Sequence, residues 1–186
     1  MNRKRNVLVL TPVYNESAGL DAYEAAVREV LLARTDCDVH VLFIEDGSSD
    51  DSWTRICALA ARDARFRGIR LSRNYGSHIA LSAGFANVGE ADAVATLACD
   101  LQDPPEAVSR FIDTWKSGAD IVWGKRLSRA TMAATGPLGI TQWACMTSNF
   151  ILPVSRHSAH RLLTNTTGVR GYIAPLTRTS ASSDSA

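Results

Sequence analysis

The sequence lacks the features that mark several common protein classes. Its four cysteines contain no Cys-x-x-Cys pair, so we expect reduced cytosolic thiols rather than disulfides or a zinc site. No apolar run approaches the roughly 18 residues of a membrane span. No Gly-x-Gly-x-x-Gly follows the first apolar run, and Gly-x-x-x-x-Gly-Lys-Ser/Thr is absent. These absences argue against a dinucleotide-binding domain and a P-loop domain.

Acidic residues are almost missing from the last third of the chain. None occurs from Ile121 to Ser183, and residues 121–186 carry seven basic residues against Asp184 alone, a net charge of +6. Residues 1–120 carry thirteen basic and eighteen acidic residues, a net charge of −5. The total of +1 gives no indication of nucleic-acid binding. We expect the basic part to face an anionic membrane or a phosphate, with a disordered tail as the alternative.

What the chain does have is a regular alternation of apolar runs and helical periodicity. With 186 residues, 46% of them hydrophobic, it is long enough for one domain with a real core. Strands are predicted at residues 7–10, 39–44, 69–71, 93–97 and 121–123. Strict alternation of strands and helices predicts an α/β fold, a mostly parallel sheet sandwiched by helices. After residue 129 the pattern fails.

A polar cluster follows each predicted strand. The carboxyl ends of parallel strands share one edge of the sheet, where open α/β sheets bind ligands. We therefore expect these clusters to meet in one crevice. They occupy residues 11–16, 45–50, 73–76, 100–106 and 124–126.

The cluster after the fourth strand has the chemistry of a cation site. Asp100 offers a carboxylate and Gln102 a neutral oxygen, which are ligands that Mg²⁺ or Mn²⁺ prefers, usually together with phosphates. Asp103, Pro104 and Glu106 fit the N-cap, first residue and capping-box partner of the next helix. The alternative interpretation is a solvated Asp100 beside a capped helix.

Other clusters carry groups suited to a nucleotide. Tyr14 can stack on a nucleobase, and Asp46 can accept a hydrogen bond from a base N–H or a ribose hydroxyl. Arg73 and Arg126 can pair with phosphate oxygens. The alternatives are a turn with a helix cap at residues 46–51 and solvated arginines.

As an ordered set, these segments resemble family 2 glycosyltransferases. The segments are Thr-Pro-Val-Tyr-Asn-Glu at residues 11–16, Glu-Asp-Gly-Ser-Ser-Asp at 45–50, Arg-Asn-Tyr-Gly at 73–76 and Asp-Leu-Gln-Asp-Pro-Pro-Glu at 100–106. The resemblance covers residues 6–129 and is greatest to the branch with dolichol-phosphate mannosyltransferase and bacterial polyprenyl-phosphate glycosyltransferases. It implies a GT-A fold with a Rossmann-like nucleotide-binding half, a hexosyltransferase-type activity and inversion at the anomeric carbon.

The resemblance also implies roles, partners and a location. The nucleotide-sugar donor, a UDP- or GDP-sugar, would be held by Pro12, Tyr14, Glu16, Asp46, Arg73 and Asp100. A divalent metal, Mg or Mn, would be held by Asp100 and Gln102. Asp100 and Arg126 would be catalytic, and Lys125, Arg126 and Arg129 resemble the basic segment near a lipid-phosphate acceptor. The expected location is cytoplasmic, at the inner face of the membrane, with peripheral membrane contact and a role in the cell envelope.

Three departures from the family pattern support a second hypothesis. The family often has Asp-x-Asp where this chain has Ala98-Cys99-Asp100, and the first of its two acids before Gly-Ser is here Glu45. The acid-free second half lacks the family's further acidic residues and its membrane helices. We therefore expect residues 1–129 to form a nucleotide-sugar-binding domain and residues 130–186 a divergent, poorly packed segment. The alternative function is a nucleotide-sugar-binding remnant without turnover.

Overall fold

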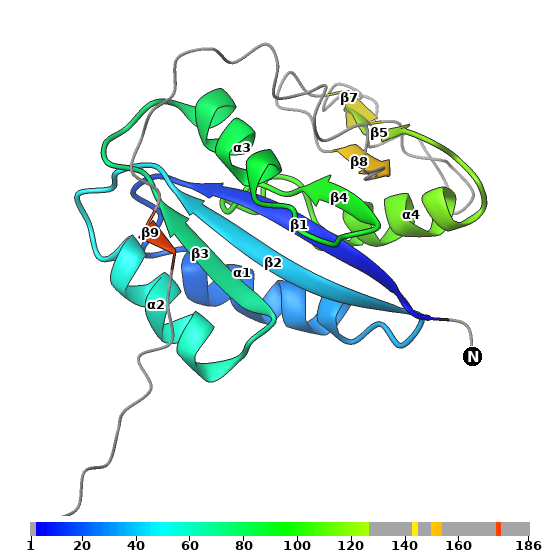
Figure 1. Cartoon of the computed structure of the whole chain (residues 1–186), viewed down its shortest axis with the longest axis horizontal. Coiled ribbons are helices and arrows are strands. Elements are labelled where there is room, and N and C mark those ends of the chain that lie inside the picture. Colours follow the sequence, from blue (N-terminus) through cyan, green and yellow to red (C-terminus); the bar gives the residue numbers. More distant parts are fainter. Residues whose placement is uncertain (1–2, 127–142, 145–149, 154–173, 176–186) are drawn as a thin grey trace, which may run out of the picture.

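Four parallel strands form the centre of the molecule (Figure 1). The computed structural model describes residues 3–126, 143–144, 150–153 and 174–175. The central strands lie in the order β4-β1-β2-β3. Their bounds are Arg5–Val13 for β1, Cys37–Glu45 for β2, Phe66–Arg70 for β3 and Ala93–Thr96 for β4. The predicted α/β fold with a mostly parallel sheet is confirmed.

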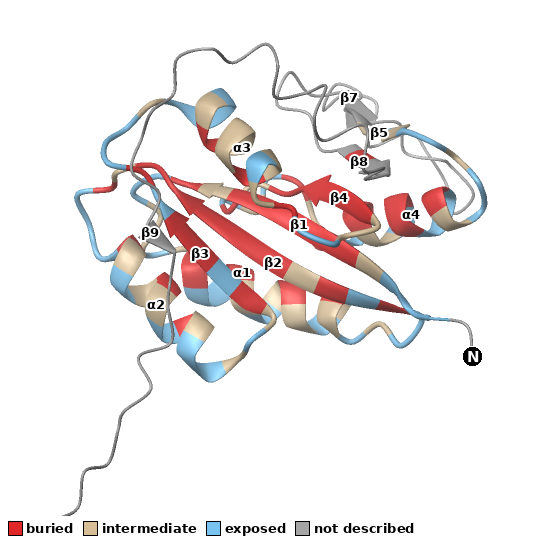
Figure 2. Ribbon diagram, viewed as in Figure 1, coloured by how far each residue is buried: buried red, intermediate tan, exposed pale blue. Residues whose placement is uncertain are grey.

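The central strands are apolar on both faces because helices cover both. In β1, Val7 and Val9 belong to one buried cluster, while Leu8 and Leu10 belong to another on the opposite face. This is why the sequence shows a continuous apolar run there rather than an alternating one. Figure 2 shows the buried residues running through the middle of β1, β2 and β3.

Among the described residues, one face of the sheet carries three helical segments and the other carries one (Figure 1). On the first lie α1 (Leu20–Val27) with its π-helical continuation η1 (Arg28–Leu32), α2 (Ser52–Arg62) and α4 (Pro105–Lys116). On the second lies α3 (Ser77–Ala86). A Cβ on Gly84 would lie 3.0 Å from the Ile44 side chain, so this small residue lets α3 approach the sheet closely.

Strands from the last third of the chain complete the sheet. The fifth predicted strand is present as β5 (Val122–Trp123), but β8 (Phe150–Pro153) lies between it and β4, antiparallel to both. A short β9 (Ala174–Pro175) pairs antiparallel with β3. Separately, β6 (Lys125–Arg126) pairs with β7 (Trp143–Ala144). Most of residues 130–186 lie outside the described residues, so the domain boundary at residue 129 stays a prediction.

The start of α4 differs from the sequence-based expectation. The helix begins at Pro105, with Pro104 as its N-cap in an extended conformation and without a side-chain capping bond. The predicted capping box of Asp103 and Glu106 is therefore wrong. A residue that precedes a proline is disfavoured in the helical region, so Pro104 stays extended and the second proline opens the helix. At its other end the helix stops at Lys116, and Gly118 follows with a φ of +112°, a left-handed conformation that suits glycine just past a helix end.

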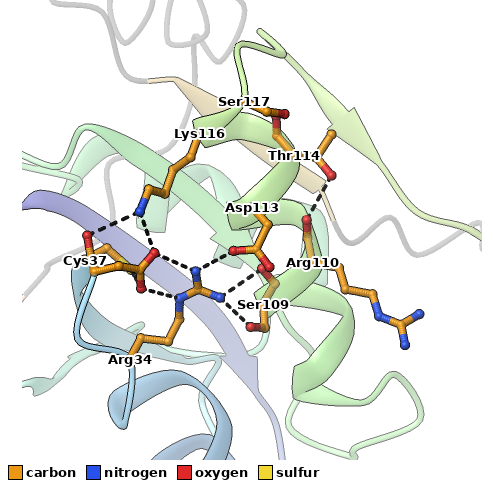
Figure 3. Close-up of polar contacts among 9 residues, drawn as sticks. Arg34, Cys37, Ser109, Arg110, Asp113, Thr114, Lys116 and Ser117 are labelled. Atoms are coloured by element: carbon orange, nitrogen blue, oxygen red, sulfur yellow. Dashed lines mark hydrogen bonds and ion pairs between the residues drawn. The ribbon is translucent and has the colours of Figure 1, made fainter.

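A cluster of ion pairs ties the turn between η1 and β2 to α4 at the amino edge of the sheet (Figure 3). The Arg34 guanidinium lies 2.8 Å from Asp36 and 2.5 Å from Asp113, and Lys116 Nζ lies 2.5 Å from Asp36. Arg34 also donates to Ser109 Oγ at 2.6 Å. This cluster is at the opposite edge from the loops described next.

In the described part of the chain, no helix is both long and apolar enough to cross a membrane.

Candidate functional site

The loops that follow β1, β2, β3 and β4 lie side by side at the carboxyl edge of the sheet. Parallel register places them there, since Val13 is opposite Glu45 and Leu10 is opposite Thr96. Backbone bonds continue the pairing past the strand ends. Asp46 N donates to Val13 O at 2.8 Å, and Leu97 N donates to Leu10 O at 3.1 Å. The expected convergence of polar clusters is therefore present for these four loops.

The loop after β1 presents Tyr14 and Glu16. Tyr14 is 47% exposed, so part of this residue is accessible to a ligand. Pro12, two residues earlier in β1, is half-buried. Below the loop, the Thr11 and Tyr23 hydroxyls are hydrogen-bonded at 2.5 Å, and burial raises the pKa of Tyr23 far above its ordinary value. A fixed, neutral pair of hydroxyls thus anchors the end of β1 to α1.

Asp46 follows β2 directly and is buried, with 3% of the residue exposed. Its two carboxylate oxygens each accept one backbone hydrogen bond at 2.8 Å, from Tyr75 N and Gly76 N. A carboxylate oxygen has room for a second bond. Asp46 thus holds the loop after β3 against the turn after β2 and keeps capacity for one more donor on each oxygen.

The loop after β3 carries the exposed Arg73. Its guanidinium carbon lies 4.2 Å from the centre of the Tyr75 ring, which is a cation–π contact. The same loop packs on Gly47, whose φ is +69° and where a Cβ would lie 2.3 Å from the Arg73 carbonyl carbon. The structure therefore brings Arg73 to the same edge as Asp46.

Asp100 and Gln102 form an exposed turn after β4. Gln102 N donates to Asp100 Oδ1 at 3.1 Å, and Leu101 between them has a φ of +53°. The pKa of Glu16 is raised by burial and by the negative charges of Asp100 and Asp50. Glu16 and Asp100 therefore lie close enough to interact, although they come from different loops.

The donor set at this turn fits Mg²⁺ or Mn²⁺. Among the described residues, no three His, Cys, Asp or Glu side chains gather as a complete metal site. One carboxylate and one amide oxygen are what a cation needs from the protein when phosphates and water supply its remaining ligands. The carboxylate of Asp100 and the amide of Gln102 meet that requirement.

Comparison with known proteins assigns the chain to a family. The family model of glycosyl transferase family 2 matches residues 8–174. The chain belongs to that family. Bactoprenol glucosyl transferase of Shigella phage SfX is 37% identical over 125 residues, covering 67% of this chain and 40% of the relative. Undecaprenyl-phosphate 4-deoxy-4-formamido-L-arabinose transferase of Erwinia tasmaniensis is 40% identical over 133 residues, covering 67% and 38%. The chain thus spans about two fifths of the length of these relatives.

Solved structures agree with the family on the fold. Mannosyltransferase PcManGT from Pyrobaculum calidifontis, in complex with GDP-Man and Mn²⁺, superposes with a TM-score of 0.55 at 15% identity, covering 68% of this chain and 36% of that one. Glucosyl-3-phosphoglycerate synthase from Mycobacterium tuberculosis, in complex with UDP, gives 0.56 at 20% identity, covering 80% and 57%. The expected GT-A fold is therefore confirmed.

The basic residues of this family 2 domain are only partly placed. The backbone of Lys125 and Arg126 is described as β6, but their side chains are not, and Arg129 lies outside the described residues. Ala98 stands where the family pattern often has an acid.

Sequence reasoning missed the polar residues that join these loops to one another. Ser48, Asp50 and Ser52 accept hydrogen bonds from the loop after β1. Their residue types signal a turn and a helix cap, which hides their contacts with a distant segment.

A cavity of about 270 Å³, lined by residues including Asn6, His40 and Arg67, lies toward the other end of the sheet and is separate from this edge.

Proposed function

We propose that this family 2 domain binds a UDP- or GDP-sugar and transfers the sugar, with inversion, to a polyprenyl phosphate. The observation that carries the proposal is the meeting of Tyr14, Asp46 and Asp100 at one edge of a GT-A sheet. Each comes from a different loop, and each has the chemistry of a different part of a nucleotide sugar. Two related proteins are a bactoprenol glucosyl transferase and an undecaprenyl-phosphate transferase, which supports the acceptor.

The donor would lie across the loops after β1, β2 and β3. Tyr14 is exposed and would stack on the base, and Pro12, two residues earlier, would also contact the nucleoside. Asp46 would accept a hydrogen bond from an N–H or O–H group of the nucleoside. Glu16 would lie toward the ribose or the diphosphate. Arg73 is exposed and would pair with a phosphate oxygen. The neighbours of the same fold in complex with GDP-Man and with UDP support a nucleotide donor.

The diphosphate would be held through a divalent metal, Mg or Mn, on Asp100 and Gln102. The chemistry that such a cation supplies is neutralisation of the charge on the leaving nucleoside diphosphate. Asp100 is the carboxylate available for this at an exposed turn, and Gln102 would add a neutral oxygen. A mannosyltransferase of the same fold carries Mn²⁺ with GDP-Man, which supports the proposal.

The acceptor would approach from the basic part of the chain. Lys125, Arg126 and Arg129 would pair with the lipid phosphate. Arg126 would also be catalytic, stabilising the negative charge of the phosphate groups in the transition state of the transfer. An acceptor phosphate oxygen forms the new bond to the anomeric carbon while the bond to the diphosphate breaks. The phosphate is ionised at neutral pH, so no strong general base is required. The +6 charge of residues 121–186 supports peripheral contact with the inner face of the membrane.

The transfer reaction itself tests the proposal. The protein is mixed with liposomes, polyprenyl phosphate, Mn²⁺ and a panel of UDP- and GDP-sugars, and glycolipid is measured. Formation of glycolipid from one donor, lost on omission of the metal, supports the transferase. Donor binding without glycolipid indicates the remnant instead. No binding of any donor contradicts both.

A further inference from the structure

Three consecutive backbone N–H groups of the loop after β1 donate hydrogen bonds to side chains of the turn after β2 and of Ser52, the first residue of α2. Asn15 N donates to Ser48 Oγ at 2.9 Å, and Ser17 N donates to Asp50 Oδ2 at 2.9 Å. Between them, Glu16 N donates to Ser52 Oγ at 3.1 Å. Each backbone N–H group of residues 15–17 therefore has its own side-chain acceptor among residues 48–52.

The contact also runs in the other direction. Ser49 N donates to Asn15 Oδ1 at 2.9 Å. Asn15 has a φ of +55°, a left-handed conformation that Asn tolerates but that local sequence alone does not enforce. Bonds from both its backbone and its side chain hold it there. The conformation of residues 15–17 is thus set by the turn after β2.

The accepting side chains are themselves held in place. Ser52 is completely buried and Ser48 is 8% exposed. Ser52 N donates to Asp50 Oδ1 at 3.0 Å, so Asp50 uses one oxygen for its own turn and one for the neighbouring loop. Ser48 N donates to the fully buried Glu45 carboxylate, which pairs with Arg70 at 2.8 Å.

These bonds are not the ordinary capping of α2. A capping side chain satisfies N–H groups of its own helix, whereas the hydroxyls of Ser48 and Ser52 accept from a segment more than thirty residues earlier in the chain. Replacing Ser52 by alanine removes its hydroxyl but keeps the hydrogen bond from Ser52 N to Asp50 at the start of α2. Loss of the hydroxyl should therefore change the loop after β1, which carries Tyr14 and Glu16, and not α2.

We propose that Ser48, Asp50 and Ser52 are positioning residues for the nucleotide site. They act through residues 15–17, holding Tyr14 and Glu16 in the arrangement that accepts the donor, and do not touch the donor themselves. The inference rests on the proposed function. Because the loop is ordered before binding, less conformational freedom is lost when the nucleotide arrives. Loosening it should weaken nucleotide binding roughly tenfold without changing the rest of the fold.

The test compares Ser48→Ala and Ser52→Ala with the wild type, with Ser48→Thr as the variant that keeps a hydroxyl. The matched control is Ser117→Ala, which removes a hydroxyl that donates to Thr114 O at the far end of α4 (Figure 3). Amide hydrogen exchange is measured across the chain, and binding of UDP and GDP with Mn²⁺ is measured by calorimetry. We expect faster exchange at residues 15–17 alone and roughly tenfold weaker binding in both alanine variants. Ser48→Thr and Ser117→Ala should behave as the wild type.

The outcomes separate this inference from the function on which it rests. A wild type that binds nucleotide, with alanine variants that bind equally well, overturns the positioning role and leaves the proposed function intact. Faster exchange throughout the sheet in both alanine variants also overturns it, because the hydroxyls then serve general stability. A wild type that binds neither nucleotide overturns the proposed function, and the inference with it.

Discussion

Two carboxylates at the carboxyl edge, Asp46 and Asp50, accept hydrogen bonds from backbone N–H groups of other loops. Asp46 joins the loop after β3 to the turn after β2, and Asp50 joins that turn to the loop after β1. A carboxylate that orders a loop can still be close to a ligand. Substitutions at such residues therefore need controls that separate loop order from binding.

Gly47 is required for two independent reasons. Its φ of +69° is strained for an L-residue, and a Cβ there would lie 2.3 Å from the Arg73 backbone. We expect Gly47→Ala to lower the free energy of unfolding by more than about 2 kcal/mol, measured by urea denaturation. Gly89→Ala is the matched control, since Gly89 has a φ of +60° but nothing within 4 Å of a Cβ. Equal losses in the two variants would contradict the close packing of the Arg73 loop on Gly47.

Tyr14 tests the base-stacking role. Because Tyr14 is 47% exposed, removing its side chain should cost little stability. Stacking of a base on an aromatic ring contributes about 1–3 kcal/mol, so Tyr14→Ala should weaken binding of UDP or GDP by roughly tenfold or more. Tyr14→Phe, which keeps the ring, should bind nearly as well as the wild type. The competing assignment, a surface tyrosine, predicts unchanged affinity in calorimetry for both variants.

At the scale of helices and strands, ion pairs join elements that are distant in the sequence. The Asp36 pKa is held well below its ordinary value by hydrogen bonds from Arg34 and then Lys116, which link η1 and β2 to α4. Arg65 and then Arg28 lower the pKa of Asp63 in the same way, linking the end of α2 to η1. The negative charge of these aspartates therefore helps to hold the helical layer together.

These aspartates predict a loss of stability in acid. A carboxylate whose pKa is lower in the folded state binds fewer protons there than in the unfolded chain. Its contribution is complete above the unfolded pKa of about 4 and is lost as the pH falls toward the folded value. Unfolding in urea between pH 7 and pH 3 should show stability falling below about pH 4. Asp36→Asn should fall less steeply, and an identical slope would show that the Asp36 pairs contribute nothing.

The elements also show what could be predicted from sequence and what could not. The central strands were predictable because each is a run of apolar residues with a helical period on either side. Phe150–Pro153 forms β8 through antiparallel pairing with β4 and β5, and four residues with no regular helical period beside them in the sequence carry too little signal. The helix start at Asp103 and Glu106 fitted a capping pattern, but the conformational restriction of Pro104 before Pro105 prevailed.

The same distinction applies to the candidate site. Parallel topology alone predicts that the positions after β1, β2 and β4 meet, so the grouping of Tyr14, Asp46 and Asp100 was accessible from the sequence. The bonds of Ser48 and Ser52 to residues 15 and 16 were not, because they depend on how two loops lie against each other. That arrangement depends on the register of the strands that precede the loops, and the pattern of apolar and polar residues in the sequence does not specify this register.

At the scale of the whole molecule, the two parts of the chain differ in charge and in proposed role. Residues 1–120 carry −5 and include the loops proposed to bind the donor, whereas residues 121–186 carry +6 and include the arginines proposed for the acceptor phosphate. A net positive end near an anionic lipid lowers the cost of bringing a phosphate to an acidic site. Because the donor is itself an anion, we expect the acidic edge to bind it through a cation.

The most direct test of that expectation is calorimetry of UDP and GDP binding, with and without Mn²⁺, to the wild type and to Asp100→Ala. Asp113→Ala is the control, because Asp113 pairs with Arg34 at the opposite edge of the sheet. We predict Mn²⁺-dependent binding to the wild type and to Asp113→Ala, and loss of most of that affinity in Asp100→Ala, since the diphosphate loses its bridging cation. Equal Mn²⁺-dependent affinity in the wild type and Asp100→Ala would contradict the account.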